Sequence, residues 1–587
     1  MSGQDVPGTR GQALQAPADI PAFDIAYNNE VMSRILEARA RKRLAAEIGT
    51  IRKPHDGSSL RIALAYPNRY HIGMSNVGFQ AVYKFWNEIS GVVCERVFLP
   101  DAEELREYRR TGRPLVTLES QTPVAEFDVL AFSITFEPDE LNLVRMLDLA
   151  RIPPLAEDRR GAGRSYPLVV AGGPITFLNP EPMAPFLDVV AIGEAEVLLP
   201  PLTEALRARL SRAELLEALG AEEGFYVPSP GDVEPGARRI VRAKMGKRAD
   251  LPPPATYVLT PDTEMSGKFL VEVSRGCPTL CSFCWAGYNY LPKRSFEIER
   301  ILEAARAARE HTSDIGLVST AVGAHKEIVP LLEALREMRF RISVSSLRFE
   351  DLRAELLEPL SASGERTLAV APEVGTDRLR FAIHKRVSNQ EIFEKVDLIL
   401  SRGIENLKLY LMVGLPTEGD EDLDGMVELV ERIRAILLEH GRARGRLGRI
   451  IPSVNPFIPK PGTPFQWHFM ESTSELSRKM RRLERAFARI GNVDAHFKSP
   501  RQEKLQALLS LGDRRLAPVM IRMARGEADL RRAMKEAGLD LDFYIHRERP
   551  RDEILPWAHI DNGMKPALLE SQYEKALSST APALSLA

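Results

Sequence analysis

Two series of β-type runs, each run followed by helical sequence, dominate this chain of 587 residues. Strands that alternate with helical stretches of this kind predict βαβ units and parallel sheets. A proline-rich stretch over 222–265 separates the two series and is expected to be a linker. The pattern therefore predicts two successive α/β domains, and the chain is long enough to carry further domains beside them.

The first series predicts a Rossmann-like, doubly wound domain over 60–221, with strands at 60–66, 129–134, 168–171 and 189–192. In such sheets the ligand crevice lies outside the carboxyl ends of the strands. Glycines at those ends would let a large flat ligand approach the backbone closely. The candidate ligand-binding residues at these strand ends are Ser133, Thr135, Gly172, Gly173, Gly193 and Glu194.

The second series predicts a partial barrel of six β/α units over 266–464, because six units fit a partial barrel better than a second open sheet. Its expected strands are 269–274, 315–318, 342–344, 367–371, 407–411 and 450–454. Amphipathic helical sequence follows and predicts a helical C-terminal domain over 465–578. The remaining segments are an expected disordered leader over 1–22, an N-terminal helix and linker over 23–59, and a tail over 579–587.

Three of the four cysteines, Cys277, Cys281 and Cys284, lie in one loop directly after the first expected barrel strand. Three thiolates are one fewer than a closed zinc site or a fully ligated iron–sulfur cluster requires. A 4Fe–4S cluster held by three sulfurs leaves one iron open to bind and reduce a substrate. One alternative is a zinc site that borrows His384 or His325. Another is a disulfide, which would leave one thiol unpaired in a chain without a secretory signal.

Barrel active sites are assembled at the carboxyl ends of the strands, so the residues that follow the later barrel strands are further candidates. Hydroxyls and a guanidinium after the third strand could hold a ribose and a carboxylate. A carboxylate ends the fourth strand, and a turn with glycine and proline closes the fifth strand, where an adenine could lie. These candidates are Ser345, Ser346, Arg348, Glu373, Met412 and Gly414.

Composition excludes several classes of protein. The 79 basic and 81 acidic residues leave a net charge of −2, so no global field indicates a nucleic acid or a membrane as partner. No uncharged apolar run reaches the roughly 18 residues of a membrane span, and the N-terminus lacks the pattern of an export signal. The sequence predicts a cytoplasmic protein, in which the remote Cys94 is a small buried residue.

From about residue 60 to about residue 575 the chain resembles the cobalamin-binding-domain radical S-adenosylmethionine (SAM) proteins. The matching stretches are 66–78, 188–196, 274–277, 371–373, 378–380, 408–416, 459–467 and 555–563. The resemblance implies that Cys277, Cys281 and Cys284 bind a 4Fe–4S cluster whose open iron chelates SAM. It also implies reductive cleavage of SAM to a 5′-deoxyadenosyl radical, cobalamin as a methyl carrier, an unidentified substrate, and a one-electron reductant such as flavodoxin or ferredoxin.

The chain departs from the family pattern in two places. The cobalamin motif Asp-x-His-x-x-Gly is absent, because the sequence around His71 has a different spacing. The resemblance then implies cobalamin with an open lower face, and His71 as a cobalt ligand is the alternative. The loop after the second barrel strand lacks the Gly-Gly-Glu that contacts the methionine amine, and Ser319 and Thr320 are its expected replacements. No second cysteine set is present for an auxiliary cluster, which argues against a sulfur-inserting methylthiotransferase.

The leading hypothesis is thus a cobalamin-dependent radical SAM methyltransferase. The first alternative is a radical SAM enzyme that abstracts hydrogen or rearranges its substrate without cobalamin. The second is a non-catalytic module that binds RNA or protein and contains a structural cluster. Basic runs over 39–43 and 478–485 are interpreted as solvated helix surfaces, with RNA contact as the alternative for the second run. Trp467 and Trp557 are predicted to cap the barrel or the domain junction.

Overall fold

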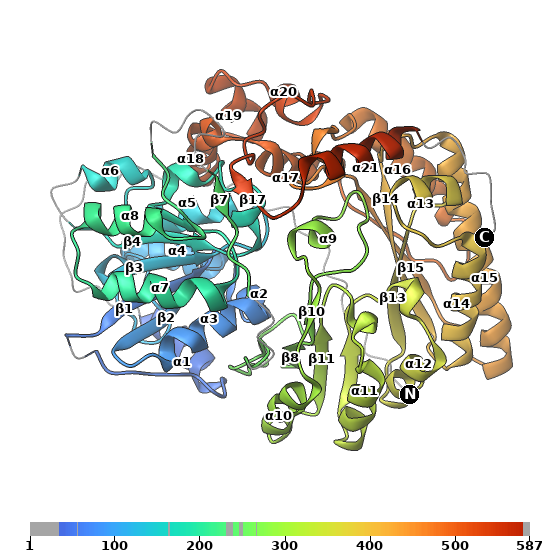
Figure 1. The fold of residues 1–587 in the computed structure, drawn as a ribbon. Helices are drawn as coiled ribbons and strands as arrows, with labels where there is room; N and C mark the ends of the chain where they lie inside the picture. The colour runs from blue at the N-terminus through green and yellow to red at the C-terminus, as the bar shows by residue number, and fades with distance from the viewer. Residues whose placement is uncertain are drawn as a thin grey trace.

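The computed structural model describes residues 34–55, 57–161, 165–229, 239–245, 251–265 and 267–578. The expected leader over 1–22 and the tail over 579–587 lie outside the described residues. Figure 1 shows two α/β units side by side, with helices from the end of the chain lying across the top of both. In the described ranges, no helix combines the length and the apolar composition that a membrane crossing needs.

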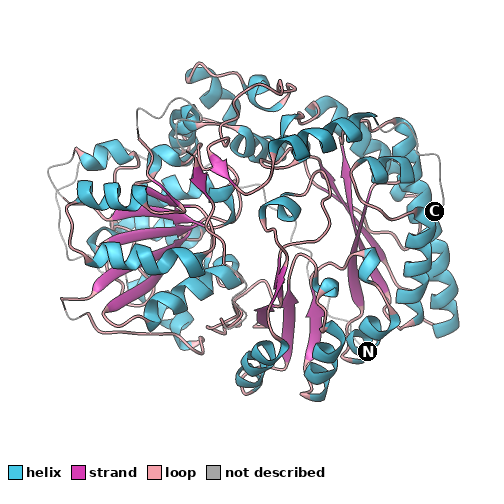
Figure 2. Ribbon diagram, in the orientation of Figure 1, coloured by secondary structure: helices cyan, strands magenta, loops and turns pink. Residues whose placement is uncertain are grey.

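The N-terminal unit is a six-stranded sheet in the order β2-β1-β3-β4-β5-β6, in which β1 to β5 are parallel and β6 is antiparallel. Its strands are β1 (Leu60–Tyr66), β2 (Val92–Phe98), β3 (Val129–Ser133), β4 (Leu168–Gly172), β5 (Val189–Ala191) and β6 (Phe225–Tyr226). Its helices are α1 (Arg34–Ala45), α2 (Tyr70–Gly73), α3 (Val77–Glu88), α4 (Ala102–Thr111), α5 (Asp139–Leu149), α6 (Ala156–Arg160), α7 (Ala195–Arg207) and α8 (Arg212–Ala221). Helices cover both faces of the sheet, as Figure 2 shows, so the central strands are apolar throughout.

Strand β2 was missing from the sequence-based expectation because charged residues interrupt its apolar pattern. Arg96 is fully buried, and its guanidinium pairs with Glu47 at 2.7 Å and with Glu119 at 2.6 Å. Glu95 is buried beside it and accepts a hydrogen bond from Ser120 Oγ at 2.6 Å. Buried charges are tolerated when they are paired in this way, so the strand has the composition of a surface segment.

The second unit is a partial barrel of parallel strands that lie side by side in chain order. The strands are β8 (Phe269–Glu272), β11 (Asp314–Val318), β12 (Arg341–Val344), β13 (Thr367–Glu373), β14 (Asn406–Val413), β15 (Ile450–Pro456) and β16 (His496–Phe497). They form a three-stranded and a four-stranded sheet, which a parallel bridge between Leu347 and Val370 joins. The six strands expected in this region are therefore present, and β16 extends the array.

Helices pack on the outside of these strands (Figure 2). They are α10 (Ile298–Arg309), α11 (Ile328–Glu337), α12 (Ala354–Ala362), α13 (Asp377–Ala382), α14 (Asn389–Ser401) and α15 (Asp420–Arg444). Along β14 and β15 buried residues alternate with half-buried ones. The buried residues pack against the helices, and the half-buried set, which includes Lys408 and Tyr410, lines the opposite face of the sheet.

The C-terminal segment ties the two units together. It contains α16 (Thr473–Phe487), α17 (Pro500–Leu511), α18 (Ala517–Arg525), α19 (Leu530–Glu536), α20 (Leu541–Ile545), β17 (Ile560–Asp561) and α21 (Pro566–Ser578). Helix α18 packs on α5 of the N-terminal unit, whereas α16 packs on α15 of the barrel. Trp467 and Trp557 are buried in an apolar cluster with α21 and barrel residues, which confirms their predicted place at a junction.

The described parts of 222–265 are built into the fold and do not behave as a free spacer. Strand β7 (Ile240–Val241) pairs in parallel with β17, and Ala243 forms a bridge with Gly193 at the end of β5. The N–H of Thr256 donates to the carbonyl of Leu270 at 2.8 Å, so this segment covers the outer edge of β8. Proline is suited to such an edge because it donates no hydrogen bond to a sheet.

The two basic runs differ in their surroundings. On α16, Arg478 is exposed and Arg482 is half-buried, and both pair with carboxylates of α15 and α16, as on a solvated helix surface. Lys479 of the same run is buried and pairs with Glu418 and Glu471, so the expectation holds only for part of this run. On α1, Arg39 and Arg43 instead reach the N-terminus of α4, where they bind carboxylates. The expectation of a purely solvated surface is therefore wrong for the first run.

Candidate functional site

The cysteine loop lies between β9 (Ser274–Arg275) and α9 (Trp285–Asn289), at the carboxyl end of β8. Cys277 and Cys281 are buried, and Cys284 is half-buried at the residue before α9. The N–H of Cys284 donates to the carbonyl of Cys281 at 2.9 Å, which folds the loop back on itself. No disulfide forms among the four cysteines, all of which are described. The disulfide alternative is therefore not realised.

Backbone hydrogen bonds hold this loop from both sides. The carbonyl of Leu280 accepts from Tyr288 Oη at 2.9 Å and from His384 Nδ1 at 2.8 Å. The N–H of Ser282 donates to the carbonyl of Ile383 at 2.9 Å. At the start of the loop Gly276 has φ +87°, and a Cβ there would lie 2.4 Å from the carbonyl oxygen of Tyr290. A residue with a side chain would therefore displace the loop.

The histidines that could complete a zinc site have both ring nitrogens engaged. Nε2 of His384 accepts from Arg386 at 3.1 Å, while its Nδ1 is used by the loop. His325 donates from Nε2 to Phe296 and accepts at Nδ1 from Glu327. Within the described ranges no three His, Cys, Asp or Glu side chains converge on one metal ion. With both histidines engaged, the three cysteines lack the fourth ligand that a closed zinc site needs.

The electrostatics of the loop indicate whether its thiols are charged. Burial raises the pKa of the Cys281 thiol above its usual range; the charges of Cys284, Glu373 and Cys277 add to this effect and Lys385 opposes it. Burial likewise raises the pKa of Cys284. Buried thiols of this kind stay protonated until a metal supplies the compensating positive charge. The loop is thus a cysteine set suited to metal binding rather than a set of free reactive thiols.

Glu373 and Lys385 form a buried ion pair beside the cysteines. Nζ of Lys385 lies 2.8 Å from Oε1 of Glu373, which ends β13 with a left-handed φ of +66°. Burial lowers the pKa of Lys385, but the negative charge of Glu373 outweighs burial and leaves that pKa raised. Glu373 is the carboxylate expected at the end of the fourth barrel strand. Lys385 was not expected, because no spacing signal connects a lysine in a loop to the cysteines.

The serines after the second and third barrel strands form a small hydroxyl network. Ser319 Oγ lies 2.7 Å from Ser274 Oγ, and Ser345 Oγ donates to the carbonyl of Ser319 at 2.7 Å. The structure thus brings these candidates together next to the strand that leads into the cysteine loop. Thr320 and Ser346 lie beside them, and both are exposed.

Of the remaining barrel candidates, Arg348 and Met412 contact or pack near the cysteine loop, whereas Gly414 packs against a helix. Arg348 contacts Thr279 inside the cysteine loop, but Nε and Nη2 of Arg348 bind both carboxylate oxygens of Asp351, at 2.8 and 2.6 Å. Met412 packs in the apolar cluster that also contains Leu280 and Phe283 of the loop. Gly414 has φ +86°, and a Cβ there would lie 2.7 Å from Leu476 of α16, so close helix packing explains this glycine.

In the N-terminal unit two candidate glycines approach protein instead of an open crevice. Gly173 has φ +107°, and a Cβ there would lie 2.5 Å from the carbonyl oxygen of Ile134. Gly193 has φ +144°, and its Cβ would lie 2.3 Å from the carbonyl oxygen of Ala243. Contact with neighbouring chain therefore explains both glycines, and their role in binding a flat ligand stays a prediction.

The other candidates at this edge are differently placed. Ser133 ends β3 beside Gly172, and Thr135 Oγ1 lies 2.7 Å from the hydroxyl of Tyr66. Glu194 was also expected to face a ligand, but its carboxylate lies 2.9 Å from Nη1 of Arg275 and 2.7 Å from Nη2 of Arg294. Its role in the structure is to hold the strands on either side of the cysteine loop.

The carboxyl ends of the two sheets face each other. Glu137, after β3, binds Lys460, which follows β15 at the far end of the barrel array. Phe177, after β4, stacks edge-to-face on Tyr290, which follows the cysteine loop, with ring centroids 5.5 Å apart. Together with Glu194 after β5, these contacts connect the edge of the N-terminal sheet to both ends of the partial barrel, and α9 lies between the units in Figure 1.

Two buried charged groups at this junction have unused hydrogen-bonding atoms. Arg242 is 1% exposed and stands over the ring of Phe177, and its Nε and Nη1 have no hydrogen-bond partner among the described residues. Burial lowers the pKa of Arg242 to about 10. Glu140 is 0% exposed at the start of α5, and neither of its carboxylate oxygens has a hydrogen-bond partner in the described chain. Burial raises the pKa of Glu140 well above its usual range.

Comparison with known proteins agrees with this arrangement. Residues 78–228 match the family model for the N-terminal region of radical SAM proteins, and residues 271–430 match the model of the radical SAM superfamily. The chain thus contains a radical SAM domain, which follows the N-terminal region found in radical SAM proteins. A radical SAM domain implies an enzyme that uses a 4Fe–4S cluster and SAM, and the cysteine loop described above fits that cluster.

Three curated relatives illustrate the range of similar proteins. An uncharacterized protein of Methanocaldococcus jannaschii is 28% identical over 83% of this chain and 96% of its own length. The cobalamin-dependent radical SAM methyltransferase TokK of Streptomyces tokunonensis is 30% identical over 37% of this chain and 30% of its own length. The threonylcarbamoyladenosine tRNA methylthiotransferase MtaB of Aquifex aeolicus is 26% identical over 28% of this chain and 42% of its own length.

Two solved structures are similar at low identity. The radical SAM methyltransferase TsrM of Kitasatospora setae, with cobalamin and a 4Fe–4S cluster, has a TM-score of 0.49 at 15% identity, over 70% of this chain and 78% of that chain. The cobalamin-dependent enzyme OxsB, with aqua-cobalamin and SAM, has a TM-score of 0.46 at 15% identity, over 64% of this chain and 52% of that chain.

Proposed function

We propose that this radical SAM enzyme is a methyltransferase that uses cobalamin as the methyl carrier. The observation that carries the proposal is the position of the N-terminal sheet, whose carboxyl edge faces the cysteine loop across the junction. A ligand bound at that edge, in the usual crevice of a doubly wound sheet, would lie next to the barrel mouth. Similarity to the methyltransferase TokK supports the same activity.

The unused atoms of Arg242 and Glu140 fit this cofactor. Cobalamin carries a phosphate and many amide side chains, so a buried guanidinium could donate to its phosphate or amide oxygens, and a buried carboxyl could bond its amide nitrogens. Both residues lie where the loops of the two units meet. Groups that lack protein partners in a buried junction are costly to fold unless a ligand satisfies them.

When bound, the cluster supplies the electron that cleaves SAM, and cobalamin supplies the methyl group. The chain's own residues hold and orient these groups. Cys277, Cys281 and Cys284 would bind three irons. The hydroxyls of Ser319 and Ser345 are placed to bond a ribose. The apolar cluster over the loop would keep water away from a radical, since exclusion of water suppresses side reactions.

A specific observation favours a second candidate, a radical SAM enzyme that works without cobalamin. Gly173 and Gly193 are explained by contact with the chain itself, so neither glycine indicates a flat ligand at the sheet edge. In this alternative the N-terminal unit closes the side of the barrel and binds no cofactor. The substrate would then be altered by hydrogen abstraction or rearrangement.

Anaerobic reconstitution with iron, sulfide and hydroxocobalamin tests the proposal. After desalting, iron, sulfide and bound cobalamin are quantified for the wild-type chain, for Cys281→Ala, and for Cys94→Ala as the control at a buried cysteine outside the loop. The proposal expects near-stoichiometric cluster and cobalamin in the wild type and the control, and cobalamin without a full cluster in Cys281→Ala. A cluster without cobalamin in the wild type would favour the second candidate.

Incubation with SAM and dithionite separates enzymatic from structural roles. A radical SAM enzyme should release 5′-deoxyadenosine in a manner that depends on Cys281. Full function of Cys281→Ala in cells would instead favour a non-catalytic module, because removal of one ligand should abolish radical chemistry.

A further inference from the structure

A cavity of about 510 Å³ lies at one end of the N-terminal sheet, beyond the carboxyl ends of β1 and β2. Its walls come from α1, α2, the start of α4 and the segment over 260–262. No residue of the cysteine loop or of the barrel strands lines it. Its volume falls within the range of sites that enclose small organic ligands. The cavity is thus a candidate binding site separate from the iron–sulfur site.

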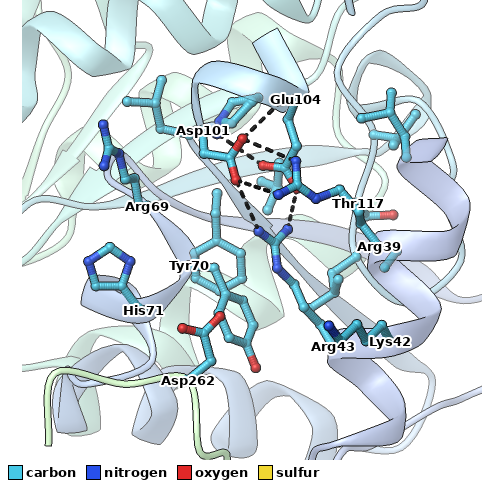
Figure 3. Close-up of a pocket in the computed structure, with 18 of the residues that line it drawn as sticks. Arg39, Lys42, Arg43, Arg69, Tyr70, His71, Asp101, Glu104, Thr117 and Asp262 are labelled. Atoms are coloured by element: carbon cyan, nitrogen blue, oxygen red, sulfur yellow. Dashed lines mark hydrogen bonds and ion pairs between the residues drawn. The ribbon is translucent and has the colours of Figure 1, made fainter. Parts of the chain in front are cut away.

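One wall of the cavity is fixed by ion pairs between α1 and α4. Nη2 of Arg39 lies 3.2 Å from Oδ2 of Asp101, and Nη1 of Arg43 lies 2.5 Å from Oε1 of Glu104. Asp101 and Glu104 also close a capping box at the N-terminus of α4. Figure 3 shows these four side chains meeting on one side of the cavity. Because their charges are satisfied, they form a rigid wall and leave the choice of ligand to the other residues.

The opposite side carries cationic and imidazole groups that have no partner. Arg69 and His71 are half-buried, and neither side chain has a hydrogen bond or ion pair within the described ranges. Lys42 is exposed on α1 beside Arg43, across the cavity from them, and it too has no such partner in the described chain. Figure 3 shows Arg69 and His71 across from Arg39 and Arg43. The one lining carboxylate without an ion pair among the described residues is Asp262, which is exposed. The uncommitted charge near the cavity is therefore positive on balance, and a guanidinium beside an imidazole offers hydrogen-bond donors to a phosphate.

Between these walls the lining is apolar and aromatic. It includes Tyr70, Phe98, Pro100 and Leu118, of which Tyr70 and Leu118 are buried in the core of the unit. Such a surface binds a flat apolar body, while the charged groups fix its orientation. We propose that this cavity binds a phosphate ester of a flat, apolar molecule, with Arg69 and His71 holding the phosphate. The proposal does not depend on the function proposed for the iron–sulfur site.

Fluorescence anisotropy with 1-naphthyl phosphate as the probe tests this proposal on the full-length protein without SAM. 1-Naphthol is the matched ligand without the phosphate. The phosphate should bind about tenfold more tightly than the naphthol, since a charge-assisted hydrogen bond contributes about that factor. Higher salt should weaken the binding of 1-naphthyl phosphate more than the binding of 1-naphthol. Equal affinities for the two probes would overturn the proposal.

Matched variants locate the binding site. Arg69→Gln should weaken binding of the phosphate about tenfold, and His71→Gln about threefold because one imidazole N–H makes a single hydrogen bond. The control is Arg41→Gln, one residue away on α1, exposed and outside the cavity lining, which should leave the affinity unchanged. Arg69 has no partner in the described chain, so its loss should not unfold the protein; matching thermal unfolding curves check this. Unchanged affinity in Arg69→Gln would refute the site.

Loading with hydroxocobalamin before the titration separates this site from the proposed cofactor site. Retained binding of the naphthyl phosphate would support a separate site. Displacement of the probe by cobalamin would overturn the separate site and make the cavity part of the cofactor site. A Cys281→Ala protein should bind the probe as the wild type does, whether or not it carries a cluster.

Discussion

Replacement of Glu194 by glutamine should loosen the cysteine loop from its base. The carboxylate of Glu194 is 3% exposed and accepts from Arg275 on one strand of the β9–β10 (Arg294–Ser295) hairpin and from Arg294 on the other. The cysteine loop lies between those two arginines in the chain. Because glutamine has the same shape but no charge, the variant changes electrostatics with little change in packing.

The size of the expected loss in stability depends on which carboxylates each arginine still pairs with in the variant. Arg275 retains Glu272 at 2.7 Å and Glu196 at 2.9 Å, whereas Arg294 loses the one carboxylate with which it pairs in the described chain. Removal of one partner of a buried ion pair lowers the free energy of unfolding by about 3–5 kcal/mol. The side chain of Arg294 is 10% exposed, so some water can reach it, and we expect the lower end, about 3 kcal/mol.

Two measurements test this prediction. Urea unfolding of the apo protein is followed through its first transition, and the iron content is measured after anaerobic reconstitution. Glu194→Gln should shift the first transition to lower urea and reduce bound iron. Glu196→Gln is the control, because Glu196 is 24% exposed and Arg275 keeps two other carboxylates; about 1 kcal/mol or less is expected. Equal shifts in the two variants, or full iron content in Glu194→Gln, would refute this account of the loop.

Two further predictions concern stability. Burial raises the pKa of Asp139 to about 7, with a smaller contribution from the charge of Glu137. The folded state therefore keeps the proton of Asp139 up to about pH 7, whereas the unfolded chain loses it near pH 4. The free energy of unfolding should thus fall, by at most about 4 kcal/mol, as the pH rises from about 4 through 7. Asp139→Asn should be more stable than the wild type at pH 8 and similar near pH 4; unfolding curves with parallel pH dependence would contradict this. Gly193→Ala should lower the free energy of unfolding by about 2 kcal/mol or more, because its Cβ would lie 2.3 Å from a carbonyl oxygen and its φ is +144°. The control is Gly161→Ala, whose Cβ would make an ordinary contact at 3.7 Å and which should change the thermal stability little. Equal effects of the two alanines would rule out the contact at Gly193.

The sequence predicts apolar strands well and charged strands poorly. The six barrel strands and four strands of the first sheet follow from apolar runs, because helices cover their outer faces. Strand β2 does not follow, since Glu95 and Arg96 are buried through ion pairs to residues outside the strand. Such partners, as far away as Glu47, come together only in the folded chain.

The residues of the candidate site also differ in how far the sequence predicts them. The cysteine loop is predictable because its three ligands are adjacent in sequence and follow a strand. Lys385 is not, because it reaches Glu373 through the fold rather than through any spacing. Glycines were the least reliable indicators, since a positive φ is equally compatible with a ligand and with neighbouring chain. At Gly173 and Gly193 neighbouring chain occupies the space.

The pairing of β7 with β17 has a consequence for synthesis of the protein. These strands lie side by side, yet about 320 residues of chain separate residue 240 from residue 560. The N-terminal sheet can form early on the ribosome, since domains generally fold as they emerge. The segment after β6 must wait for its partner until the whole barrel and most of the C-terminal segment have been made, and contacts of such long range form slowly. A nascent chain that is stopped before residue 560 should therefore keep the strand next to Ala243 unpaired and be a target for chaperones or proteases.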